Sequence, residues 1–324
     1  MREVMLARGA HKLAADLARV QPGEEVLVVT EYGMASIAER VARAAAALGG
    51  RVVTAIVPPF RGQGEDFPPA VAAAMREAAV LFMPLAVSMS HTPAVHEARR
   101  RGARAVMMSD WTDEMFASPA LVETDFAAQA VVVRRLGAIL SGGRRFRLTT
   151  PRGTDLRFES GGRRANELTD IPGPGEIAPV PTIEVNFAPL EGTAEGALVV
   201  DASIPFLGVG PLREPITLRV ERGFVTKVEG GGEQGKRFRE GVAAHNDPNC
   251  WNVAEFGVGL NPNATITGRA LMDEGVMNTA HVAIGTSRML GGAVTAAAHY
   301  DMVFWEPTLE ADGKIVYRGD TILA

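Results

Sequence analysis

Apolar runs of strand length alternate with stretches of helical period along the first half of the chain. The predicted strands span residues 24–30, 51–57, 80–86 and 104–109. The predicted helices span residues 2–19, 34–48, 69–78 and 92–102, followed by helical sequence to about residue 137. Because continuous apolar strands separated by helices are covered on both faces, this half is predicted to form a doubly wound parallel sheet.

The pattern changes near Gly142, after which short alternating strands and turn residues dominate the sequence. Two hairpins are predicted, the first joining residues 145–150 to 155–160 and the second joining 216–221 to 224–229. Further strands are predicted at 197–204 and 314–318, and a helix at 233–244. The expected fold class is α/β, with a doubly wound domain at residues 1–140 and a strand-rich α+β domain at residues 141–324.

Composition narrows the functional classes. The 324 residues carry a formal charge of −5 and a pI near 5.8, which argues against a dedicated nucleic-acid-binding protein. The single Cys250 excludes a disulfide framework and a zinc site built on cysteines. No apolar run reaches the roughly 18 residues of a membrane helix, and the N-terminal stretch does not resemble a signal peptide. A cytoplasmic protein with no membrane partner is therefore expected.

The sharpest chemical feature is the segment His299-Tyr300-Asp301 within an apolar run. Since side chains alternate along a strand, His299 and Asp301 are expected on one face, where a ring nitrogen and a carboxylate oxygen can share a cation. A second histidine would complete the ligand set typical of non-haem Fe(II), whereas further carboxylates would suit a two-metal hydrolase. The alternative is a surface strand on which both side chains face solvent.

Three more ionisable residues, Glu184, Glu255 and His281, lie within apolar, strand-like segments. A buried carboxylate or imidazole needs hydrogen bonds or a cation, so each of them is a candidate for a functional site. The alternative for His281 is a core histidine whose ring nitrogens are satisfied by hydrogen bonds. The alternative for the two glutamates is a carboxylate that faces solvent. Glu176 competes with Glu184 for the same role.

Two other histidines are candidates. His245 begins a polar, turn-prone segment, and its alternative is an exposed loop histidine. His91 follows a predicted strand, and ligands in open α/β sheets approach the carboxyl ends of strands. The alternative for His91 is a position just before a helix capped by Thr92. No functional role is expected for His11 or His96.

Together these segments resemble a known superfamily, which joins the aminopeptidase T-like metallo-aminopeptidases with the 2,5-dihydroxypyridine 5,6-dioxygenases of nicotinate degradation. The resemblance is strongest over about residues 170–305. It is carried by four ordered segments, Glu184-Val185-Asn186-Phe187-Ala188-Pro189, Glu255-Phe256-Gly257-Val258-Gly259, His281-Val282-Ala283-Ile284-Gly285 and His299-Tyr300-Asp301.

The aminopeptidase branch of the resemblance implies two divalent ions, such as Zn²⁺, Co²⁺ or Mn²⁺. Their implied ligands are Glu184, Glu255, His281, His299 and Asp301. The peptidase pattern has a catalytic tyrosine seven residues after the histidine of the third segment, where this chain has Arg288. Because an arginine suits an anionic substrate and does not replace a phenol, peptidase activity is the less favoured alternative.

The dioxygenase branch implies one Fe(II) held by two histidines and one aspartate. His299 and Asp301 match directly, and the second histidine is either His245, favoured for its long separation from the pair, or His281. In the favoured arrangement His281, Glu255 and Glu184 orient ligands or carry protons, and His91 acts as an acid or base.

The resemblance therefore implies a ring-opening dioxygenase acting on a hydroxylated N-heteroaromatic with O₂. For 2,5-dihydroxypyridine the family's product is N-formylmaleamate. Because family members are often homo-oligomers, the resemblance also implies a homo-oligomer. A third possibility is a protein that binds a small ligand without chemistry. It is less favoured because buried charges that serve no purpose destabilise a fold.

Overall fold

The computed structural model describes residues 2–60 and 65–323, which fall into two compact units. Unit 1 comprises Met1–Ala130 and Leu168–Pro181, and unit 2 comprises Val131–Glu167 and Thr182–Ala324. A single boundary was expected between residues 140 and 141. That position lies inside helix α7 (Phe126–Gly142), and the chain also returns once to unit 1 after entering unit 2.

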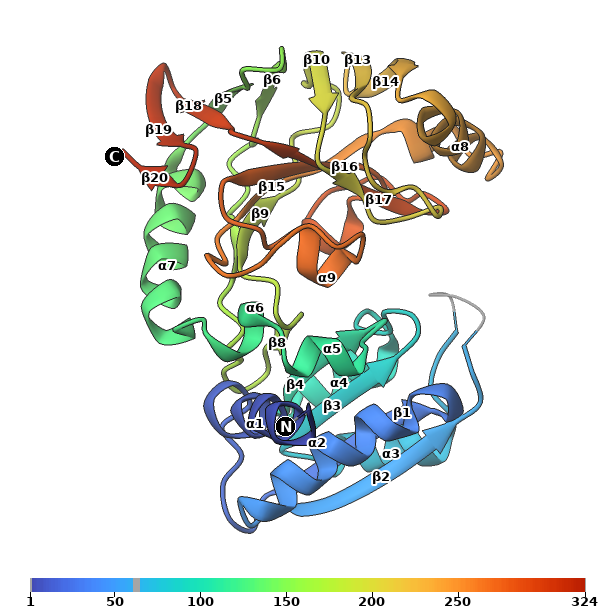
Figure 1. The fold of residues 1–324 in the computed structure, drawn as a ribbon. Coiled ribbons are helices and arrows are strands. Elements are labelled where there is room, and N and C mark those ends of the chain that lie inside the picture. Colours follow the sequence, from blue (N-terminus) through green and yellow to red (C-terminus); the bar gives the residue numbers. More distant parts are fainter. Residues whose placement is uncertain (1, 61–64, 324) are drawn as a thin grey trace. The chain divides into compact units, whose positions relative to one another are not determined.

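Unit 1 contains a parallel five-stranded sheet in the order β2-β1-β3-β4-β8 (Figure 1). Its strands are β1 (Glu25–Glu31), β2 (Arg51–Val57), β3 (Val80–Leu85), β4 (Arg104–Ser109) and β8 (Ile177–Ala178). Its helices are α1 (Arg2–Lys12), continued by the π-helical turn Leu13–Leu17, then α2 (Ala35–Ala47), α3 (Pro69–Glu77), α4 (Pro93–Arg100), α5 (Asp113–Phe116) and α6 (Pro119–Val122). The predicted alternation of buried strands and helices is confirmed.

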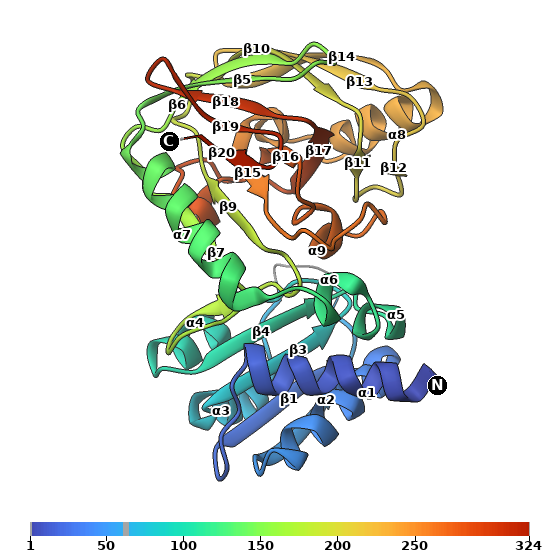
Figure 2. The same cartoon turned by 60° about the vertical axis from the view of Figure 1, so that its left-hand side comes forward.

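Strand β1 is buried on both faces of this sheet, as its continuous apolar sequence predicts. Leu27 and Val29 pack into a cluster with Met75 of α3 and Val95 of α4. The alternate residues of β1 point to the other face, which α1 and α2 cover (Figures 1 and 2). Helices therefore lie on both faces of the sheet, which is the doubly wound arrangement.

Unit 2 is built on two sheets. One has the order β14-β13-β10-β6-β5-β18-β19-β20, and the other has the order β12-β11-β17-β16-β15-β9-β7. The strands of the first are β5 (Arg145–Thr149), β6 (Asp155–Glu159), β10 (Glu195–Val200), β13 (Ile216–Glu221), β14 (Phe224–Gly230), β18 (Thr308–Ala311), β19 (Lys314–Arg318) and β20 (Thr321–Ile322). Those of the second are β7 (Asn166–Leu168), β9 (Glu184–Phe187), β11 (Ser203–Ile204), β12 (Gly210–Pro211), β15 (Val253–Gly259), β16 (Thr279–Gly285) and β17 (His299–Trp305). Helices α8 (Gly232–Ala243) and α9 (Ala270–Asp273) complete the unit, and both predicted hairpins are confirmed.

An aromatic core joins the two sheets of unit 2. The ring of Phe146 on β5 lies 5.2 Å from that of Phe187 on β9, and Phe158 on β6 lies 5.2 Å from Phe256 on β15. All four side chains are buried. Because strand side chains alternate, the neighbours of Phe187 and Phe256 point away from this core, toward the opposite face of the seven-stranded sheet.

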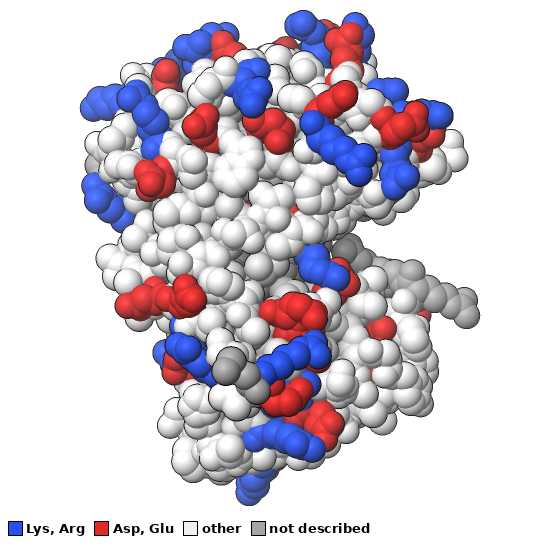
Figure 3. Space-filling view, viewed as in Figure 1, with Lys and Arg blue, Asp and Glu red and all other residues white. Residues whose placement is uncertain are grey.

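No single helix in the described part of the chain is both long and apolar enough to cross a membrane. The pair Asp113–Val122 and Phe126–Gly142, bent by 69°, passes that test only when the two helices are taken together. On the face drawn in Figure 3, basic and acidic side chains are interspersed.

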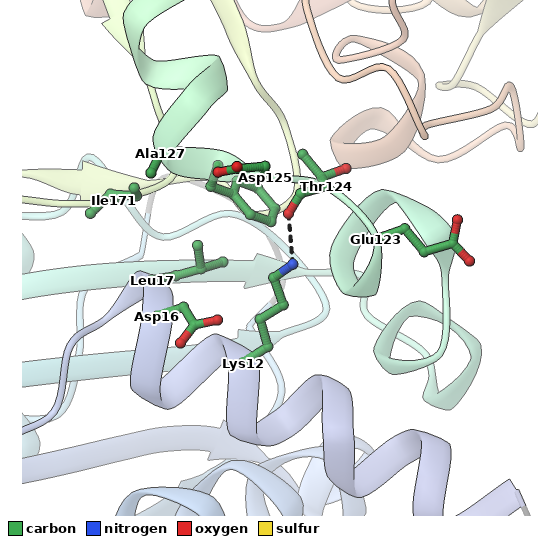
Figure 4. A pocket seen from close by; sticks show the side chains of 9 residues that line it. Lys12, Asp16, Leu17, Glu123, Thr124, Asp125, Ala127 and Ile171 are labelled. Atoms are coloured by element: carbon green, nitrogen blue, oxygen red, sulfur yellow. Dashed lines mark hydrogen bonds between the residues drawn. The ribbon is translucent and has the colours of Figure 1, made fainter.

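A pocket of about 390 Å³ lies in unit 1, beside the end of α1 (Figure 4). The Lys12 ammonium points into it and donates hydrogen bonds to the backbone carbonyls of Val122 and Thr124. The Lys12 Nζ atom also lies 5.3 Å from the ring centroid of Phe126. None of the candidate site residues lines this pocket. The Lys12 ammonium is used in hydrogen bonds to the backbone segment that precedes α7.

Candidate metal centre

Five of the candidate side chains come together on one face of the seven-stranded sheet. Glu184 comes from β9, Glu255 from β15, and His281 from β16. His299 and Asp301 are two residues apart on β17. The four strands are neighbours in the sheet, so backbone hydrogen bonds hold all five residues in one frame.

The strand registers explain why the side chains share this face. Ala283 of β16 lies between Glu255 and Asp301, and residues directly opposite one another in antiparallel strands point the same way. The register of β15 against β16 shifts between Val253 and Glu255. A bulge of this kind changes the direction of a side chain, and here it precedes Glu255.

The five side chains form two overlapping groups whose ligand atoms lie close enough to share a cation. One group is Glu184, Glu255 and His281, and the other is Glu255, His299 and Asp301. In the first group His281 Nε2 lies 3.4 Å from Glu184 Oε2 and 3.6 Å from Glu255 Oε1. In the second, His299 Nε2 lies 2.9 Å from Glu255 Oε2 and 3.5 Å from Asp301 Oδ1. Glu255 therefore offers one oxygen to each group.

Hydrogen bonds from outside the cluster orient its members. The backbone carbonyl of Thr286 lies 2.8 Å from His299 Nδ1 and accepts a hydrogen bond from it, which leaves Nε2 directed into the cluster. Asn186 Nδ2 donates to Glu184 Oε1 at 2.6 Å, and Asn166 Nδ2 donates to Asn186 Oδ1 at 2.8 Å. The chain from Asn166 through Asn186 thus fixes one oxygen of Glu184 and leaves the other directed at His281.

Small residues make room for these long side chains. A Cβ atom on Gly257, which faces His281 across β15 and β16, would overlap the imidazole ring of His281. A Cβ atom on Gly259 would overlap the backbone carbonyl of Val276 in the segment that covers this face. The two glycines of the Glu255-Phe256-Gly257-Val258-Gly259 segment are therefore required by close packing at the site.

The cluster concentrates charge in a region shielded from water. Glu184, Glu255, His281 and Asp301 are each 5 % exposed or less. Burial raises the pKa of Glu184 to about 8 against the opposing effect of the His281 ring. Burial alone would lower the pKa of His281, yet the surrounding carboxylates, Glu184 first, raise it to about 9. The carboxylates thus favour the protonated form of the imidazoles, and a divalent cation can offset the same negative charge.

The structure does not bring His245 to this cluster, although it was expected to be a metal ligand. Its Nε2 atom lies 2.6 Å from the hydroxyl oxygen of Tyr300, at the exposed end of α8. Tyr300 stands between His299 and Asp301 on β17, so its side chain points to the opposite face of the sheet. His281, the alternative second histidine, lies within the cluster.

The other expected residues lie elsewhere. His91 is exposed in unit 1 just before α4, and Thr92 caps that helix by accepting a hydrogen bond from the Val95 amide. Glu176 also lies in unit 1, where its carboxylate accepts from the Gly173 amide, so it does not compete with Glu184. Arg288 lies in unit 2, exposed in a short turn after β16.

Sequence reasoning did not identify two residues of the site. Glu274, in the turn after α9, hydrogen-bonds to Asp301, and burial together with the nearby carboxylates raises its pKa well above the ordinary range. No strand periodicity marks this residue, because it lies in a turn. Asn186 could have been found, since it is two residues from Glu184 on the same strand and therefore on the same face.

An Asn186→Leu variant is expected to bind a divalent metal up to about 10-fold more weakly, because Glu184, which Asn186 orients, belongs to one of the two groups that could hold a cation. The leucine has a similar size but cannot donate to Glu184 Oε1. Competition between the protein and a chelator of known affinity measures the change. Asn166→Leu, one hydrogen bond further from the carboxylate, should weaken binding less. Equal affinity for Asn186→Leu and the parent protein would contradict the orienting role.

Comparisons with known proteins agree with this architecture. In solved structures, the 2,5-dihydroxypyridine dioxygenase of Pseudomonas putida superposes with a TM-score of 0.84 and 22 % identity, covering 100 % of this chain and 98 % of that chain. Wild-type AmpT from Thermus thermophilus superposes with a TM-score of 0.69 and 18 % identity over the whole of both chains. At these identities the superpositions show a shared fold.

Sequence comparison shows the family. A curated relative, the 2,5-dihydroxypyridine 5,6-dioxygenase of Pseudomonas putida, is 31 % identical over 147 residues, a segment that spans 41 % of this chain and 41 % of the relative. The sequence profile described as 2,5-dihydroxypyridine 5,6-dioxygenase matches residues 9–323, nearly the full length. The chain belongs to the 2,5-dihydroxypyridine 5,6-dioxygenase family.

Proposed function

We propose that the chain is an Fe(II)-dependent ring-opening dioxygenase that acts on a hydroxylated N-heteroaromatic such as 2,5-dihydroxypyridine, as a step of nicotinate degradation. Membership of the family supports the reaction class. The observation that carries the proposal is the convergence of Glu255, His299 and Asp301, one imidazole and two carboxylates, at a buried point of the seven-stranded sheet.

The side chains present fit a divalent cation. Glu184 Oε2 is buried and, among the described residues, has no hydrogen-bond partner, although carboxylate oxygens at such depth normally have one. His281 Nε2 faces this oxygen and Glu255 Oε1 at distances longer than a good hydrogen bond. Imidazole nitrogen and carboxylate oxygen are ligands that Fe(II) accepts, together with Zn²⁺, Mn²⁺ and Co²⁺.

In the proposed enzyme His299, Asp301 and Glu255 hold the metal, which supplies the redox chemistry between the substrate and O₂ when it is bound. Thr286 keeps the His299 ring in the orientation that ligation needs. His281 and Glu184, 3.4 Å apart, hold and return the proton of the substrate hydroxyl. His91 is proposed as a further acid or base.

The proposed reaction balances without another reactant. The C5–C6 bond of 2,5-dihydroxypyridine breaks, and each of these two carbons gains one oxygen atom from O₂. Carbon 5, which carries the hydroxyl group, becomes a carboxylic acid, and carbon 6 becomes a formyl group on nitrogen. The product is N-formylmaleamate, and the four electrons that reduce O₂ come from the ring itself.

Anaerobic reconstitution with Fe(II), followed by O₂ uptake in the presence of 2,5-dihydroxypyridine, tests the proposal. We expect one O₂ consumed per substrate, with one iron bound per chain. 2-Hydroxypyridine, which lacks the hydroxyl at carbon 5, serves as the matched control and should give no uptake. Absence of uptake with 2,5-dihydroxypyridine by the iron-loaded protein would overturn the proposed substrate.

A second candidate function is a two-metal hydrolase of the aminopeptidase T-like kind. The observation that favours it is the position of Glu255, whose two oxygens face two different ligand groups, as a carboxylate bridging two ions would. Two metals bound per chain and no O₂ uptake would support this function. Arg288→Tyr then restores the phenol of the peptidase pattern, and a gain of peptidase activity would show that the remaining hydrolytic groups are in place.

A further inference from the structure

The loop of residues 286–298 joins β16 to β17, the two strands that carry His281 and His299. Its residues are small, apolar or hydroxyl-bearing, with Arg288 as the single charged exception. Thr286 begins the loop, and its carbonyl accepts a hydrogen bond from His299 Nδ1 at 2.8 Å. Because Arg288 follows Thr286 by two residues, their Cα atoms lie within about 7 Å of each other. The loop therefore holds a permanent positive charge close to a candidate metal ligand.

Hydrogen bonds within the loop fix the backbone on both sides of Arg288. The Ser287 amide donates to the Val294 carbonyl at 3.0 Å, and the Ser287 hydroxyl accepts from the Val294 amide at 3.2 Å. The Ser287 carbonyl accepts from the Gly292 amide at 2.9 Å. A Cβ atom on Gly292 would overlap the Ser287 hydroxyl, so the turn closes only around a glycine. The position from which the Arg288 side chain starts is thus well defined.

Side chains from other parts of unit 2 anchor the rest of the loop. Glu191 Oε1 accepts a hydrogen bond from the Ala293 amide at 2.6 Å, while Arg163 holds the other oxygen of Glu191 at 2.6 Å. Asp247 Oδ2 accepts from the Ala297 amide at 2.8 Å. The loop is therefore part of the fixed frame around the cluster, as the strands are.

Arg288 itself takes no part in this anchoring. The residue is exposed, and its guanidinium forms no hydrogen bond or ion pair with any residue that the structure describes. Arg163 and Arg147 of the same unit, in contrast, pair with the carboxylates of Glu191 and Asp155. A guanidinium binds a carboxylate through two parallel hydrogen bonds, and that of Arg288 is available for a ligand.

The charges of the cluster explain why such a group is needed. In the proposed reaction an uncharged ring becomes a product with a carboxylate at the former carbon 5. The charges of Glu255 and Asp301 together balance those of a divalent cation, so this ligand group offers no net positive charge to the new carboxylate. Glu184 and Glu274 add further carboxyl groups to the cluster. A positive charge from outside the ligand groups is required to hold the product anion.

We infer that Arg288 binds the carboxylate of the ring-opened product, which makes the loop of residues 286–298 the anion-binding element of the site. The inference rests on the proposed function for the identity of the anion. Because the substrate ring is uncharged and the product is not, the pairing with Arg288 strengthens as the ring opens. An interaction of this kind favours the reaction more than it favours substrate binding.

Calorimetric titration of the full chain loaded with Fe(II), without O₂ or substrate, tests the inference. The probe is maleamate, which has the carboxylate and carbon chain of the product, and maleamide is its neutral counterpart of nearly the same shape. We expect Arg288→Leu to weaken maleamate binding about 10-fold, as the loss of a charge-assisted hydrogen bond does, and to leave maleamide binding unchanged. Arg288→Lys should lie between the two, because it keeps the charge and loses the paired donors.

Arg219→Leu is the matched control, because Arg219 is exposed on β13 of the other sheet and should not affect maleamate binding. Added salt should weaken maleamate binding to the parent more than to Arg288→Leu. No maleamate binding by the parent, or equal affinity in the parent and Arg288→Leu, would overturn the inference. An equal loss of maleamide affinity in Arg288→Leu would overturn it as well, since the variant would then have a distorted site.

The outcome for Arg288 is separable from that of the proposed function. O₂ uptake with 2,5-dihydroxypyridine, combined with maleamate binding that does not depend on Arg288, would overturn the inference alone. Absence of uptake, combined with maleamate binding that does depend on Arg288, would overturn the proposed reaction and retain the carboxylate site.

Discussion

An Asp301→Ala variant is expected to lose measurable metal binding and ring-opening activity while it keeps its fold. Asp301 belongs to the candidate ligand group with Glu255 and His299, and the residue is 5 % exposed. Removing a direct ligand should weaken metal binding by more than the roughly 100-fold that changes around the ligands can cost. Stability of the protein without metal should fall by about 1–3 kcal/mol, because the substitution removes a carboxylate that favours the protonated His299 ring, while it also relieves repulsion among the remaining acids.

Metal content by atomic absorption, O₂ uptake and thermal unfolding together check this expectation. Asp320→Ala provides the control, since Asp320 is exposed near β20, far along the chain from the cluster residues of β9, β15 and β16, and accepts a hydrogen bond from the Thr321 hydroxyl. The control should retain the metal and the activity of the parent. Full activity in Asp301→Ala would exclude Asp301 from the ligand set.

A Gly257→Ala variant is expected to disable the site through a single added methyl group. The new Cβ atom would overlap the His281 ring, which neighbouring strands confine on both sides. Either the ring or the backbone of β15 must then move, at a cost of about 1–3 kcal/mol typical of overpacking. Because His281 faces Glu184 and Glu255, we expect metal affinity to fall at least about 10-fold along with stability.

Chelator competition and chemical denaturation of the Gly257→Ala protein measure the two effects. Gly142→Ala is the matched control, because a Cβ atom there meets nothing within 4 Å at the end of α7. That variant should behave like the parent protein in both measurements. If Gly257→Ala bound metal as tightly as the parent, the position of the His281 ring would not affect metal binding.

Much of this fold follows from local patterns in the sequence. The apolar residues of β1 and β3 follow one another without the polar alternation of a half-exposed strand. Both strands do lie in the centre of a sheet that is covered on both faces. The alternation of His299, Tyr300 and Asp301 placed the first and last on one face. Acids within apolar runs, Glu184 and Glu255, indicated a buried polar site, since burying them unpaired is unfavourable.

Other features depend on which strands become neighbours, which local patterns do not contain. The separation of His245 from the His299-Tyr300-Asp301 segment favoured it as a ligand, yet its partner is Tyr300 on the opposite face. His281 reaches the cluster because β16 is inserted between β15 and β17. Glu274 contributes from a turn, where neither helical nor strand periodicity applies.

The candidate metal ligands are widely separated along the sequence, so a metal ion can bind them only after the strands that carry them have folded together. Glu184 and Asp301 are far apart in the sequence and meet only when β9, β15, β16 and β17 have all paired. A nascent or unfolded chain therefore offers no complete set of ligands, and the ion binds the native state alone. By mass action such binding contributes about 2.7 kcal/mol at a metal concentration 100 times Kd. Resistance to proteolysis should accordingly rise with the concentration of a metal that the cluster binds, so that the supply of this metal would influence how long each molecule survives.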